Sequence, residues 1–470
     1  MKYLVSCFLL FLVLIAVFSC EPEADVVTRQ PKVNLAFSAD TVLFDTVFVQ
    51  TGSVTKRLLV YNYNKNAVEI NEIKLGKLDA SAYRMIINGI ETPRAQNIRI
   101  RGGDSLYVLV KVFIEPSNRN LPFLVNDSVT FTLNQAVQDV KLVAYGQDAY
   151  FHRKSELTGN NVWFADKPHV IYDHVTVTAG STLIIEKGAR IYANNAAYIY
   201  VDGTLRVEGT AEERVTFAGY RLEPFYKEIP GLWGGIRFRA ASKNNNIQYA
   251  DIKNAVVGIG AENPDQDPAT YDIRLAQCTL RNMSQAGILS YSADVQAINT
   301  LITNCGEYAV AGFGGGTYDF TYCTLANFTP EFRRQTPSLF FSDRYQDATG
   351  QNVDYRIKLN MINSIVWAGK RNGALREEIG FLNEAGLPLD TVLRHNILQT
   401  QAYEQSLNKS NLFNQDPKFK SMVYPIDFSL DTLSVANGAA GPVPEVKNDL
   451  KNIPRDAEKP DIGAYERIRP

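Results

Sequence analysis

Thr182-Leu183-Ile184-Ile185-Glu186 and Thr204-Leu205-Arg206-Val207-Glu208 are two versions of one short pattern, and the second begins 22 residues after the first. Both runs contain residue types that favour β-strands. Gly180 and Gly203 stand just before the two runs, where the chain would have to bend. A repeat with a period of about 20–50 residues is typical of a solenoid, in which each unit packs on its neighbours. The pattern therefore predicts a solenoid built from short strands.

A second pattern, small–x–apolar–x–Asn, recurs further along the chain. Its four copies are Ala250–Asn254, Cys278–Asn282, Thr300–Asn304 and Cys323–Asn327, and they begin 28, 22 and 23 residues apart. A small side chain can point inward at a crowded corner, while Asn tolerates a left-handed backbone and hydrogen-bonds to adjacent turns. We therefore predict that the copies stack coil upon coil with a ladder of Asn side chains. In that arrangement Cys278 and Cys323 are small buried hydrophobic residues.

The first part of the chain alternates apolar and polar residues between turn signals. Val33, Leu35 and Phe37 show this alternation. Short, regularly spaced strands of this kind suggest a β-sandwich. The segment, which includes the strand and turn Leu58-Leu59-Val60-Tyr61-Asn62, resembles immunoglobulin-like modules. The resemblance implies an immunoglobulin-like β-sandwich over 33–149.

The first residues read as a targeting segment and not as part of the fold. An apolar run extends from Tyr3 to Phe18, which is too short for a comfortable membrane span. A Cys directly after such a run has a specific meaning as a site of lipid attachment, so we predict a lipoprotein signal peptide over 1–19 and lipidation of Cys20. The alternative is an ordinary secretory signal peptide that is cleaved elsewhere. Residues 20–32 are polar and show no periodicity, which predicts a tether.

The composition limits the class of function. Of 470 residues, 45% are hydrophobic and 21% are charged, and the formal net charge is −2. The chain shows no run of Lys and Arg, so we predict no nucleic-acid partner. Cys7 and Cys20 fall in the targeting segment, and the other three of the five cysteines cannot form a fully paired disulfide framework.

Two stretches connect the targeting segment with a known class of proteins. Val17-Phe18-Ser19-Cys20 resembles a bacterial lipobox, although Phe18 is bulkier than the usual residue at its position. The acidic stretch Glu21–Asp25 resembles the surface-export signal of Bacteroidota lipoproteins. These resemblances imply a lipid-anchored protein of the outer membrane that is displayed at the cell surface.

The repeat region resembles the right-handed parallel β-helix proteins of the pectate-lyase-like superfamily. The resemblance rests on Val201–Leu205, on Trp233–Ile236 and on the closing element Pro460–Glu466. It implies that the chain is all-β, with the β-sandwich followed by a right-handed parallel β-helix and its C-terminal closing segment over 150–470. Most members of this family have no assigned activity.

The sequence shows no catalytic constellation. The calcium ligands and basic residue of lyases with this fold, and the paired Asp and Gly-His-Gly of polygalacturonases, do not occur as motifs here. The stretch 262–268 is rich in oxygen ligands but matches no known calcium loop, and Gly312–Gly316 reads as a tight corner that lacks the residues of a phosphate loop. We predict no metal and no cofactor, and we leave the question of an enzyme open. The four histidines, His152, His169, His174 and His395, are assigned structural or surface roles.

The last stretch brings several charged residues close together in the sequence. Asp449, Arg455, Asp461 and Glu466 are the members of this group. Arg binds carboxylates in a fork-like geometry, and the exposed edges of terminal strands need covering. We predict an Arg–carboxylate network that holds the terminal coil closed.

Two insertions interrupt the repeat, one at 220–227 and one that runs from 331 to 345. Insertions in solenoids map to loops on one face, which is often the binding face. Their Arg and aromatic side chains suit contact with a protein or a glycan, and the alternative is a loop that covers the sheet. The candidate partner-binding residues are Tyr220, Arg221, Phe225, Tyr226, Phe332, Arg333, Arg334, Phe340, Phe341, Arg344 and Tyr345.

Three hypotheses for the function follow. The first is a non-catalytic surface lipoprotein that binds a glycan or an envelope protein, with a subunit of an envelope transport or assembly complex as one form of it. The second is a polysaccharide lyase or glycoside hydrolase of the pectate-lyase-like class, which needs acidic and basic groups that converge in one groove. The third is an adhesin, which would show an exposed row of aromatic residues along the solenoid.

Overall fold

In the computed structural model, the described residues are 26–28, 33–134, 136–262, 270–328, 334–371, 374–407 and 410–468. The chain divides into two compact units, with the boundary between Asp148 and Ala149. The predicted signal peptide, Cys20 and most of the predicted tether lie outside the described residues. Within these ranges, none of the helices has the length and apolar character needed to span a membrane.

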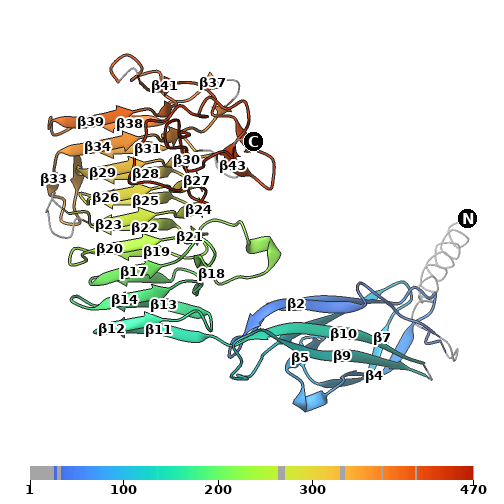
Figure 1. Cartoon of the computed structure of the whole chain (residues 1–470). Coiled ribbons are helices and arrows are strands. Elements are labelled where there is room, and N and C mark those ends of the chain that lie inside the picture. The colour runs from blue at the N-terminus through green and yellow to red at the C-terminus, as the bar shows by residue number, and fades with distance from the viewer. Residues whose placement is uncertain are drawn as a thin grey trace, which may run out of the picture. The chain divides into compact units, whose positions relative to one another are not determined.

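The first unit contains two five-stranded sheets (Figure 1). In spatial order, the strands of one sheet are β1 (Ala36–Phe37), β3 (Lys56–Tyr61), β8 (Ser105–Val112), β5 (Tyr83–Ile87) and β6 (Ile90–Glu91). Those of the other are β2 (Thr41–Phe48), β10 (Ala136–Gln147), β9 (Phe123–Leu133), β4 (Val68–Leu75) and β7 (Arg94–Ile100). A short 3-10 helix, η2, spans Leu78–Ala80.

The two sheets of the first unit pack face to face through aromatic side chains. The ring centroids of Phe37 and Phe131, from different sheets, lie 4.9 Å apart, and those of Phe44 and Tyr83 lie 5.8 Å apart. The strands alternate buried and partly exposed residues, as expected for sheets with one face in a core. The predicted β-sandwich is therefore present, and its assignment as immunoglobulin-like stays a prediction.

The second unit is a stack of parallel strands that form three columns, visited in the order 1, 2, 3 along each coil. Column 1 is a nine-stranded sheet of β12 (Asn160–Trp163), β14 (Thr182–Glu186), β17 (Thr204–Glu208), β20 (Asn245–Gln248), β23 (Ile273–Ala276), β26 (Val295–Ile298), β29 (Gly316–Thr321), β34 (Ile357–Ile362) and β39 (Leu389–Arg394). A second sheet, with 18 strands in the described residues, begins with β11 (Tyr150–Leu157) and β13 (His169–Val177) and supplies the other two columns.

Column 2 contains β15 (Arg190–Ala193), β18 (Val215–Gly219), β21 (Ala250–Lys253), β24 (Thr279–Met283), β27 (Leu301–Cys305), β30 (Thr324–Ala326), β35 (Ile365–Val366), β40 (Ile397–Leu398) and β41 (Leu412–Phe413). Column 3 contains β16 (Tyr198–Val201), β19 (Gly235–Phe238), β22 (Val257–Glu262), β25 (Ala286–Tyr291), β28 (Tyr308–Phe313), β31 (Leu339–Ser342) and β38 (Ile379–Leu382). Figure 1 shows these strands stacked in chain order from β11 to β39.

The 22-residue repeat corresponds to one coil of this stack. β14 and β17 pair in parallel with Thr182 opposite Thr204 and Leu183 opposite Leu205, so equivalent residues of the two copies lie in register. Leu183 and Leu205 are fully buried. Because side chains alternate along a strand, the apolar positions of every coil enter one continuous core. The predicted parallel β-helix is confirmed, and its right-handed sense stays a prediction.

The small–x–apolar–x–Asn copies form the corners around column 2. The small residues Ala250, Cys278, Thr300 and Cys323 are all buried, as predicted. At the other end of the pattern, Asn304 donates from Nδ2 to Oδ1 of Asn282 at 2.7 Å. Asn254, Asn282 and Asn304 have positive φ angles of 64°, 59° and 51°, which Asn tolerates better than most residues. The Asn ladder therefore exists, and its rung between Asn282 and Asn304 is a direct side-chain contact.

The three cysteines of the β-helix are free thiols inside this core. Burial raises the pKa of Cys278 to about 11 and the pKa of Cys323 to about 12. Cys305 is also fully buried, and burial raises its pKa to about 12. Since the thiolate is the reactive form, these cysteines act as small packing residues.

The glycine-rich stretch between β28 and β29 is a tight corner, as predicted. Gly314, Gly315 and Gly316 have positive φ angles of 70°, 76° and 112°. A Cβ atom on Gly315 would lie 2.3 Å from the carbonyl oxygen of Tyr355, which is closer than real contacts allow. Only glycine fits this close approach of two backbone segments.

The C-terminal segment 416–467, called the strap below, runs along the outer side of column 2 (Figure 1). It contains the antiparallel pair β42 (Phe419–Ser421) and β43 (Asp427–Leu430). Its apolar residues, such as Ile462, share a buried cluster with Ile365 and Ile397 of column 2. The strap therefore covers apolar surface that the coils alone would expose to water.

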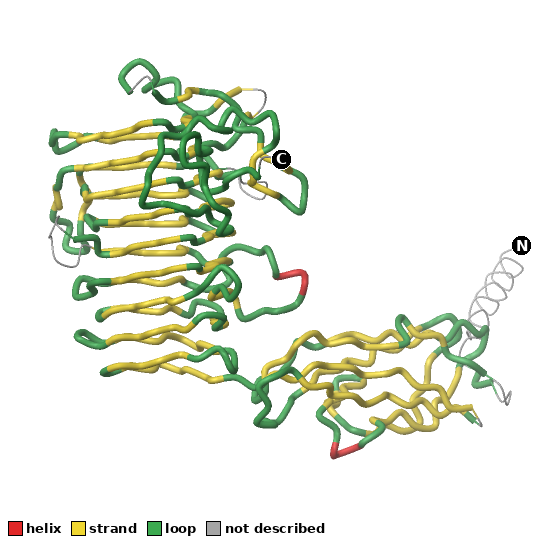
Figure 2. The backbone as a smooth tube through the Cα atoms, viewed as in Figure 1, coloured by secondary structure: helices red, strands yellow, loops and turns green. Residues whose placement is uncertain are grey.

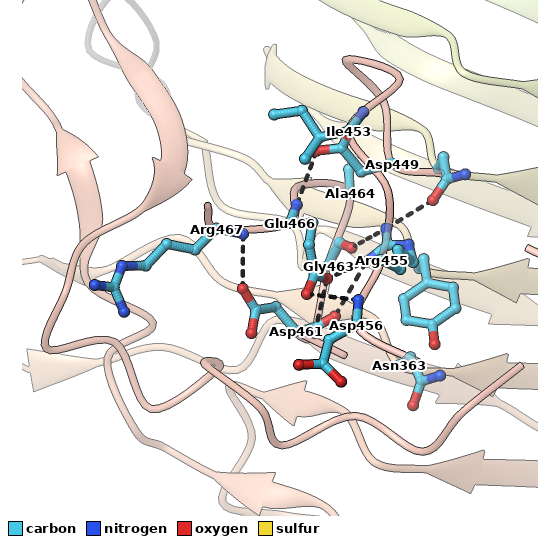
Figure 3. A network of polar contacts seen from close by, with 12 residues as sticks. Asn363, Asp449, Ile453, Arg455, Asp456, Asp461, Gly463, Ala464, Glu466 and Arg467 are labelled. Carbon is cyan, nitrogen blue, oxygen red and sulfur yellow. Dashed lines mark hydrogen bonds and ion pairs between the residues drawn. The ribbon is translucent and has the colours of Figure 1, made fainter. Parts of the chain in front are cut away.

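A polar network fastens the strap to the coils, and Figure 3 shows it from close by. Arg455 donates from Nη2 to Oδ1 of Asn299 at 2.7 Å and to the carbonyl oxygen of Gly463 at 2.9 Å. Its Nη1 lies 3.3 Å from Oε2 of Glu466, and its Cζ lies 3.7 Å from the ring centroid of Tyr322. Both side chains of the Arg455–Glu466 pair are 3% exposed.

Carboxylates and backbone groups complete this network. Asp449 accepts hydrogen bonds from the backbone N–H groups of Ile453 at 2.7 Å and Glu466 at 2.8 Å. Burial raises the pKa of Asp449 above its usual range. The backbone N–H of Arg467 donates to Oδ2 of Asp461 at 2.8 Å. The predicted Arg–carboxylate network is present, but it does not hold the terminal coil closed: Arg455 reaches Asn299 and Tyr322 in coils below the last one, so the network fastens the strap to the side of the stack.

We predict that Arg455→Ala lowers the free energy of unfolding of the β-helix by about 3–5 kcal/mol, because it leaves a buried carboxylate without its partner. Urea unfolding followed by intrinsic fluorescence measures this loss. Arg206→Ala is the matched control, since Arg206 pairs with Glu208 at 3.5 Å on an exposed surface. That control should cost about 1 kcal/mol or less. Equal effects of the two variants would contradict the proposed role of the network.

Candidate functional site

Three insertions occur at the same corner of the β-helix, between columns 2 and 3. They are residues 220–234 between β18 and β19, 327–338 between β30 and β31, and 367–378 between β35 and β38. The third carries the short hairpin of β36 (Lys370–Arg371) and β37 (Ala374–Leu375). The sequence singled out parts of the first two and missed the third, because β35 has only two residues and shows no repeat of its own.

The first insertion carries four of the candidate partner-binding residues and includes the short 3-10 helix η3 (Pro224–Tyr226). Arg221 pairs with Glu223 at 2.9 Å, and its Cζ lies 4.0 Å from the ring centroid of Tyr226. Phe225 is 75% exposed. Tyr220 packs near Tyr172 of β13, with ring centroids 5.7 Å apart. Figure 2 shows this loop, marked by the red turn of η3, reaching out from the stack.

The second insertion is fixed by a buried ion pair. Phe332 and Arg333 lie outside the described residues. Arg334 is 3% exposed, and its Nη2 lies 2.8 Å from Oε2 of the fully buried Glu378 in the third insertion. Ser338 also donates to Glu378, from its hydroxyl at 2.6 Å. Arg334 therefore joins two insertions and does not face a partner.

Of the four remaining partner-binding candidates, two lie on a strand of column 3 and two lie at the corner between columns 3 and 1. Phe340 and Phe341 belong to β31, and Phe341 is buried in the core while Phe340 faces outward. Arg344 and Tyr345 lie on the hairpin of β32 (Arg344–Gln346) and β33 (Asn352–Asp354), between columns 3 and 1. Arg344 makes a two-pronged contact with Asp354, with both N–O distances 2.7 Å. The residues from 331 to 345 are therefore not one loop, because a strand passes through the middle of them.

Four outward-facing aromatic residues of column 3 gather with Tyr345 of the adjacent β32–β33 hairpin. We call this group the aromatic cluster: Tyr291, Tyr308, Phe313, Phe340 and Tyr345. Ring centroids lie 5.9 Å apart for Tyr291 and Phe313, 5.6 Å for Phe313 and Phe340, and 5.1 Å for Tyr291 and Tyr345. Each ring is partly exposed. Two of the predicted residues, Phe340 and Tyr345, are therefore brought together with three residues that the sequence did not single out.

A groove of about 1030 Å³ lies on the outer face of column 2. Its floor comes from β24 and β27. One wall is the first insertion at Lys227 and Glu228, and the other is the β42–β43 end of the strap. We call it the strap groove. It is an open depression and not an enclosed pocket, which suits an elongated ligand more than a small one.

The floor and the first wall of the strap groove are joined through one carboxylate. Oε2 of Glu228 lies 2.5 Å from Nη1 of Arg281 and accepts a hydrogen bond from Nδ2 of Asn282 at 2.6 Å. Asn282 is also a rung of the Asn ladder. The ladder that stacks the coils therefore also positions the charged group on the groove wall.

The strap wall combines positive charge with exposed apolar surface. Asp427 lies 3.9 Å from Nζ of Lys420 and 4.0 Å from Nζ of Lys451. Partial burial opposes the charge on Asp427, but hydrogen bonds from Ser429 and the two Lys lower its pKa below the ordinary value. At the tip, Val423 and Tyr424 are 78% and 71% exposed. Among the lining residues, Lys227, Arg281, Lys420 and Lys451 outnumber the carboxylates Glu228 and Asp427 by two charges.

A pair of histidines that the sequence did not bring together joins the first two coils, one from β11 and one from β13. Nε2 of His152 is 3.0 Å from Nδ1 of His169, and the Trp163 ring stacks on both, with centroids 4.6 Å and 4.5 Å away. Burial lowers the pKa of each histidine to about 4. The two are 17 residues apart but occupy nearby positions on the adjacent strands β11 and β13, so only the coil register reveals the contact.

The described residues contain no group of three or more His, Cys, Asp or Glu that could hold a metal ion. Of the oxygen-rich stretch 262–268, only Glu262 is described, and its Oε1 lies 3.1 Å from Nη2 of Arg237. His174 lies 2.7 Å from Asp173 and away from the His152–His169 pair. The chemistry that these residues offer is therefore ion pairing and hydrogen bonding.

No family model matches the chain, and no curated protein sequence matches it. Among solved structures it resembles a family 123 glycoside hydrolase from Clostridium perfringens at 6% identity, over 28% of this chain and 31% of that one, with a TM-score of 0.19. It also resembles a protein of unknown function from Porphyromonas gingivalis W83 at 13% identity, over 27% and 60% of the two chains, with a TM-score of 0.17. The chain covers less than two thirds of either structure, and overlaps this small carry no argument about function.

The histidine pair makes stability depend on pH. Both pKa values are near 4 in the folded chain against an ordinary value of 6.5, so the unfolded chain binds more protons between these values. The contribution of the pair to the free energy of unfolding is fully present above pH 6.5 and is lost as the pH falls toward 4. We expect a loss of up to about 5 kcal/mol for the two groups together, measured by urea unfolding at pH 7 and pH 4.5.

The control for this prediction is the double variant His152→Phe/His169→Phe, which keeps aromatic contacts with Trp163 and removes the two titrating groups. Carboxylates elsewhere titrate equally in the wild type and the variant. The difference between their slopes of unfolding free energy against pH therefore gives the contribution of the two histidines. A wild-type slope that equals the slope of the variant would contradict the prediction.

Proposed function

We propose that this chain is a non-catalytic, lipid-anchored surface protein of the outer membrane that binds an acidic glycan chain in the strap groove. The observation that carries the proposal is the combination of four cationic side chains with the exposed Tyr424 along one open groove. An acidic glycan presents carboxylates to the cations, and the apolar faces of its sugar rings to an aromatic side chain.

Electrostatics supports an anionic ligand. The chain as a whole carries a formal net charge of −2, so the excess of positive charge in the strap groove is a local feature. A groove lined with one sign of charge raises the local concentration of oppositely charged ligands. Lys420 and Lys451 are 68% and 55% exposed and can move to meet a ligand. Binding of this kind weakens as salt increases, since exposed charges are screened.

The state of the carboxylates supports a binding role over catalysis. Glycoside hydrolysis needs one protonated carboxylic acid and one free carboxylate. Glu228 is engaged by Arg281 and Asn282, and Asp427 is held in its ionised form by Ser429 and the neighbouring Lys. Neither group is a poised proton donor in this geometry.

A lyase or hydrolase of the β-helix class is the second candidate, and the observation that favours it is that Glu228 and Asp427 line the same groove. The enzyme hypothesis predicts cleavage products, whereas the binding hypothesis predicts none. Incubation with polygalacturonate, followed by measurement of unsaturated ends by ultraviolet absorbance and of reducing ends, separates them. Accumulation of either product that is lost in Glu228→Gln or Asp427→Asn would overturn the non-catalytic proposal.

We predict that Lys420→Ala/Lys451→Ala weakens binding of polygalacturonate oligomers by about tenfold at low salt, because each lost contact removes a charge-assisted interaction. Isothermal titration calorimetry at two ionic strengths measures the affinity and its salt dependence. Lys187→Ala/Arg206→Ala is the control, since it removes two exposed charges from β-helix residues that do not line the groove. Equal affinities of the two double variants would exclude the groove as the site.

The anchor has its own test. We expect Cys20→Ala to move the protein from the membrane fraction to the soluble fraction and to abolish incorporation of a labelled palmitate analogue, because Cys20 is the only attachment point in the proposal. Cys7→Ala is the control, since Cys7 lies inside the predicted signal peptide. Unchanged fractionation of the Cys20 variant would contradict lipid anchoring.

A protein partner is the other form of the binding hypothesis. The exposed Phe225 of the first insertion is available for such a contact. Affinity purification of the tagged native chain from membranes distinguishes the two forms. A stoichiometric partner that is lost in Phe225→Ala and retained in Lys420→Ala/Lys451→Ala would favour an envelope complex over a glycan.

A further inference from the structure

A smaller hollow of about 220 Å³ lies on the outer face of column 3, away from the strap groove. Its main lining residues are Tyr198, Arg237, Gly260, Glu262, Gln285 and Tyr291. We infer that this hollow is a binding site for one neutral pyranose ring, such as a terminal hexose of a glycan. The inference is independent of the strap groove, because the two sites share no lining residue.

The hollow exists because one outward-facing position has no side chain. Arg237, Gly260 and Leu289 occupy the same register position on β19, β22 and β25. A Cβ atom built on Gly260 would make ordinary van der Waals contact with Cγ of Arg237 at 3.6 Å and would clash with nothing, so a side chain could be placed here. The conformation does not require a glycine here, since its φ is not in the left-handed region. The glycine therefore leaves space in the outer face of column 3, and the backbone conformation at this position does not require a glycine.

Two tyrosine rings wall the hollow, and both are held in place by other rings. Tyr198 lies across Gly234, where an added Cβ would come within 2.3 Å of its ring, and it stacks on Tyr200 at 5.3 Å and 13°. Tyr291 packs against Phe313 at 5.9 Å and against Tyr345 at 5.1 Å. Rings that are fixed before binding lose little conformational entropy when a ligand arrives.

Fixed aromatic walls suit the apolar faces of a sugar. The C–H groups on one face of a pyranose carry partial positive charge, and the face of an aromatic ring carries partial negative charge. A flat aliphatic ligand lacks hydroxyl groups and would leave the polar lining of the hollow without partners. The tyrosines therefore supply affinity, and the polar side chains supply selectivity.

The polar lining is charged but locally neutral. Arg237 and Glu262 pair at 3.1 Å, so the hollow offers N–H donors and carboxylate acceptors without net charge. Gln285 adds an amide with both a donor and an acceptor. Sugar hydroxyls donate and accept at once, which matches this set. A carboxylate ligand would compete with Glu262 for Arg237, so the pairing favours a neutral sugar over an acidic one.

The test uses the mature chain and a panel of neutral monosaccharides: glucose, galactose, mannose and N-acetylglucosamine, with galacturonic acid as the charged comparison. Saturation-transfer difference NMR detects binding, and titration gives the affinity. We expect at least one neutral sugar to bind and, in Lys420→Ala/Lys451→Ala, where the strap groove is weakened, to bind better than galacturonic acid. Absence of binding by every neutral sugar, or a preference for the acid in that double variant, would overturn the inference.

Gly260→Leu fills the hollow and should weaken sugar binding by about tenfold or more, as should Tyr291→Ala, which removes one wall. Thermal unfolding checks that each variant is folded, and Tyr291→Ala keeps the test valid if Gly260→Leu is not. Phe225→Ala is the control, because it removes an exposed aromatic ring from the same unit and should leave binding unchanged.

The strap groove variant separates the two sites. Lys420→Ala/Lys451→Ala should keep its affinity for the neutral sugar while it loses affinity for polygalacturonate oligomers. If it loses both, the neutral sugar occupies the strap groove and the inference about column 3 fails. If neutral sugar binding survives in Gly260→Leu and Tyr291→Ala, the hollow is likewise excluded.

Discussion

Parallel pairing in register between successive coils is the constraint on which the rest of the β-helix depends. Once Thr182 lies opposite Thr204, every residue of that strand has a fixed height and a fixed face. A slip of one residue would turn the buried side chains outward, because side chains alternate along a strand. The buried small residues and the Asn282–Asn304 contact hold the same register at the corners. Register also decides function here, since both proposed sites combine residues from several coils at matched positions.

The stack separates what must be constant from what can vary. Inward positions carry the apolar core, and a change there disturbs packing in neighbouring coils. Outward positions and the corner between columns 2 and 3 accept charged groups, rings and whole insertions. The strap groove uses an insertion and the strap as walls, whereas the hollow on column 3 uses an omitted side chain, Gly260. The same scaffold thus forms one proposed site with added chain segments and the other with a position that carries no side chain.

Much of this architecture could be predicted from local patterns. The 22-residue repeat predicts the length of one coil, and the small–x–apolar–x–Asn copies predict the corners. Four charged residues that are close in the sequence predict the network around Arg455. The sites could not be predicted in the same way. The strap groove joins Glu228, Arg281 and Asp427, which are far apart in the chain and meet only because the strap folds back. Arg334 and Phe341 looked like surface residues because the sequence does not show that β31 and the ion pair with Glu378 hold them inside.

The strap also changes what kind of solenoid this is. In a simple solenoid each repeat contacts only its neighbours, so stability is a sum of local terms and the ends can fray. Here Asn448 accepts from Asn299, Gly441 exchanges hydrogen bonds with Asn363, and Ala464 donates to Thr324, so one segment contacts three successive coils at once. Opening any one of these coils therefore breaks contacts with the strap as well as the pairing with its neighbours. The strap also follows the coils in the chain, so during synthesis the coils are made before the strap that fastens them.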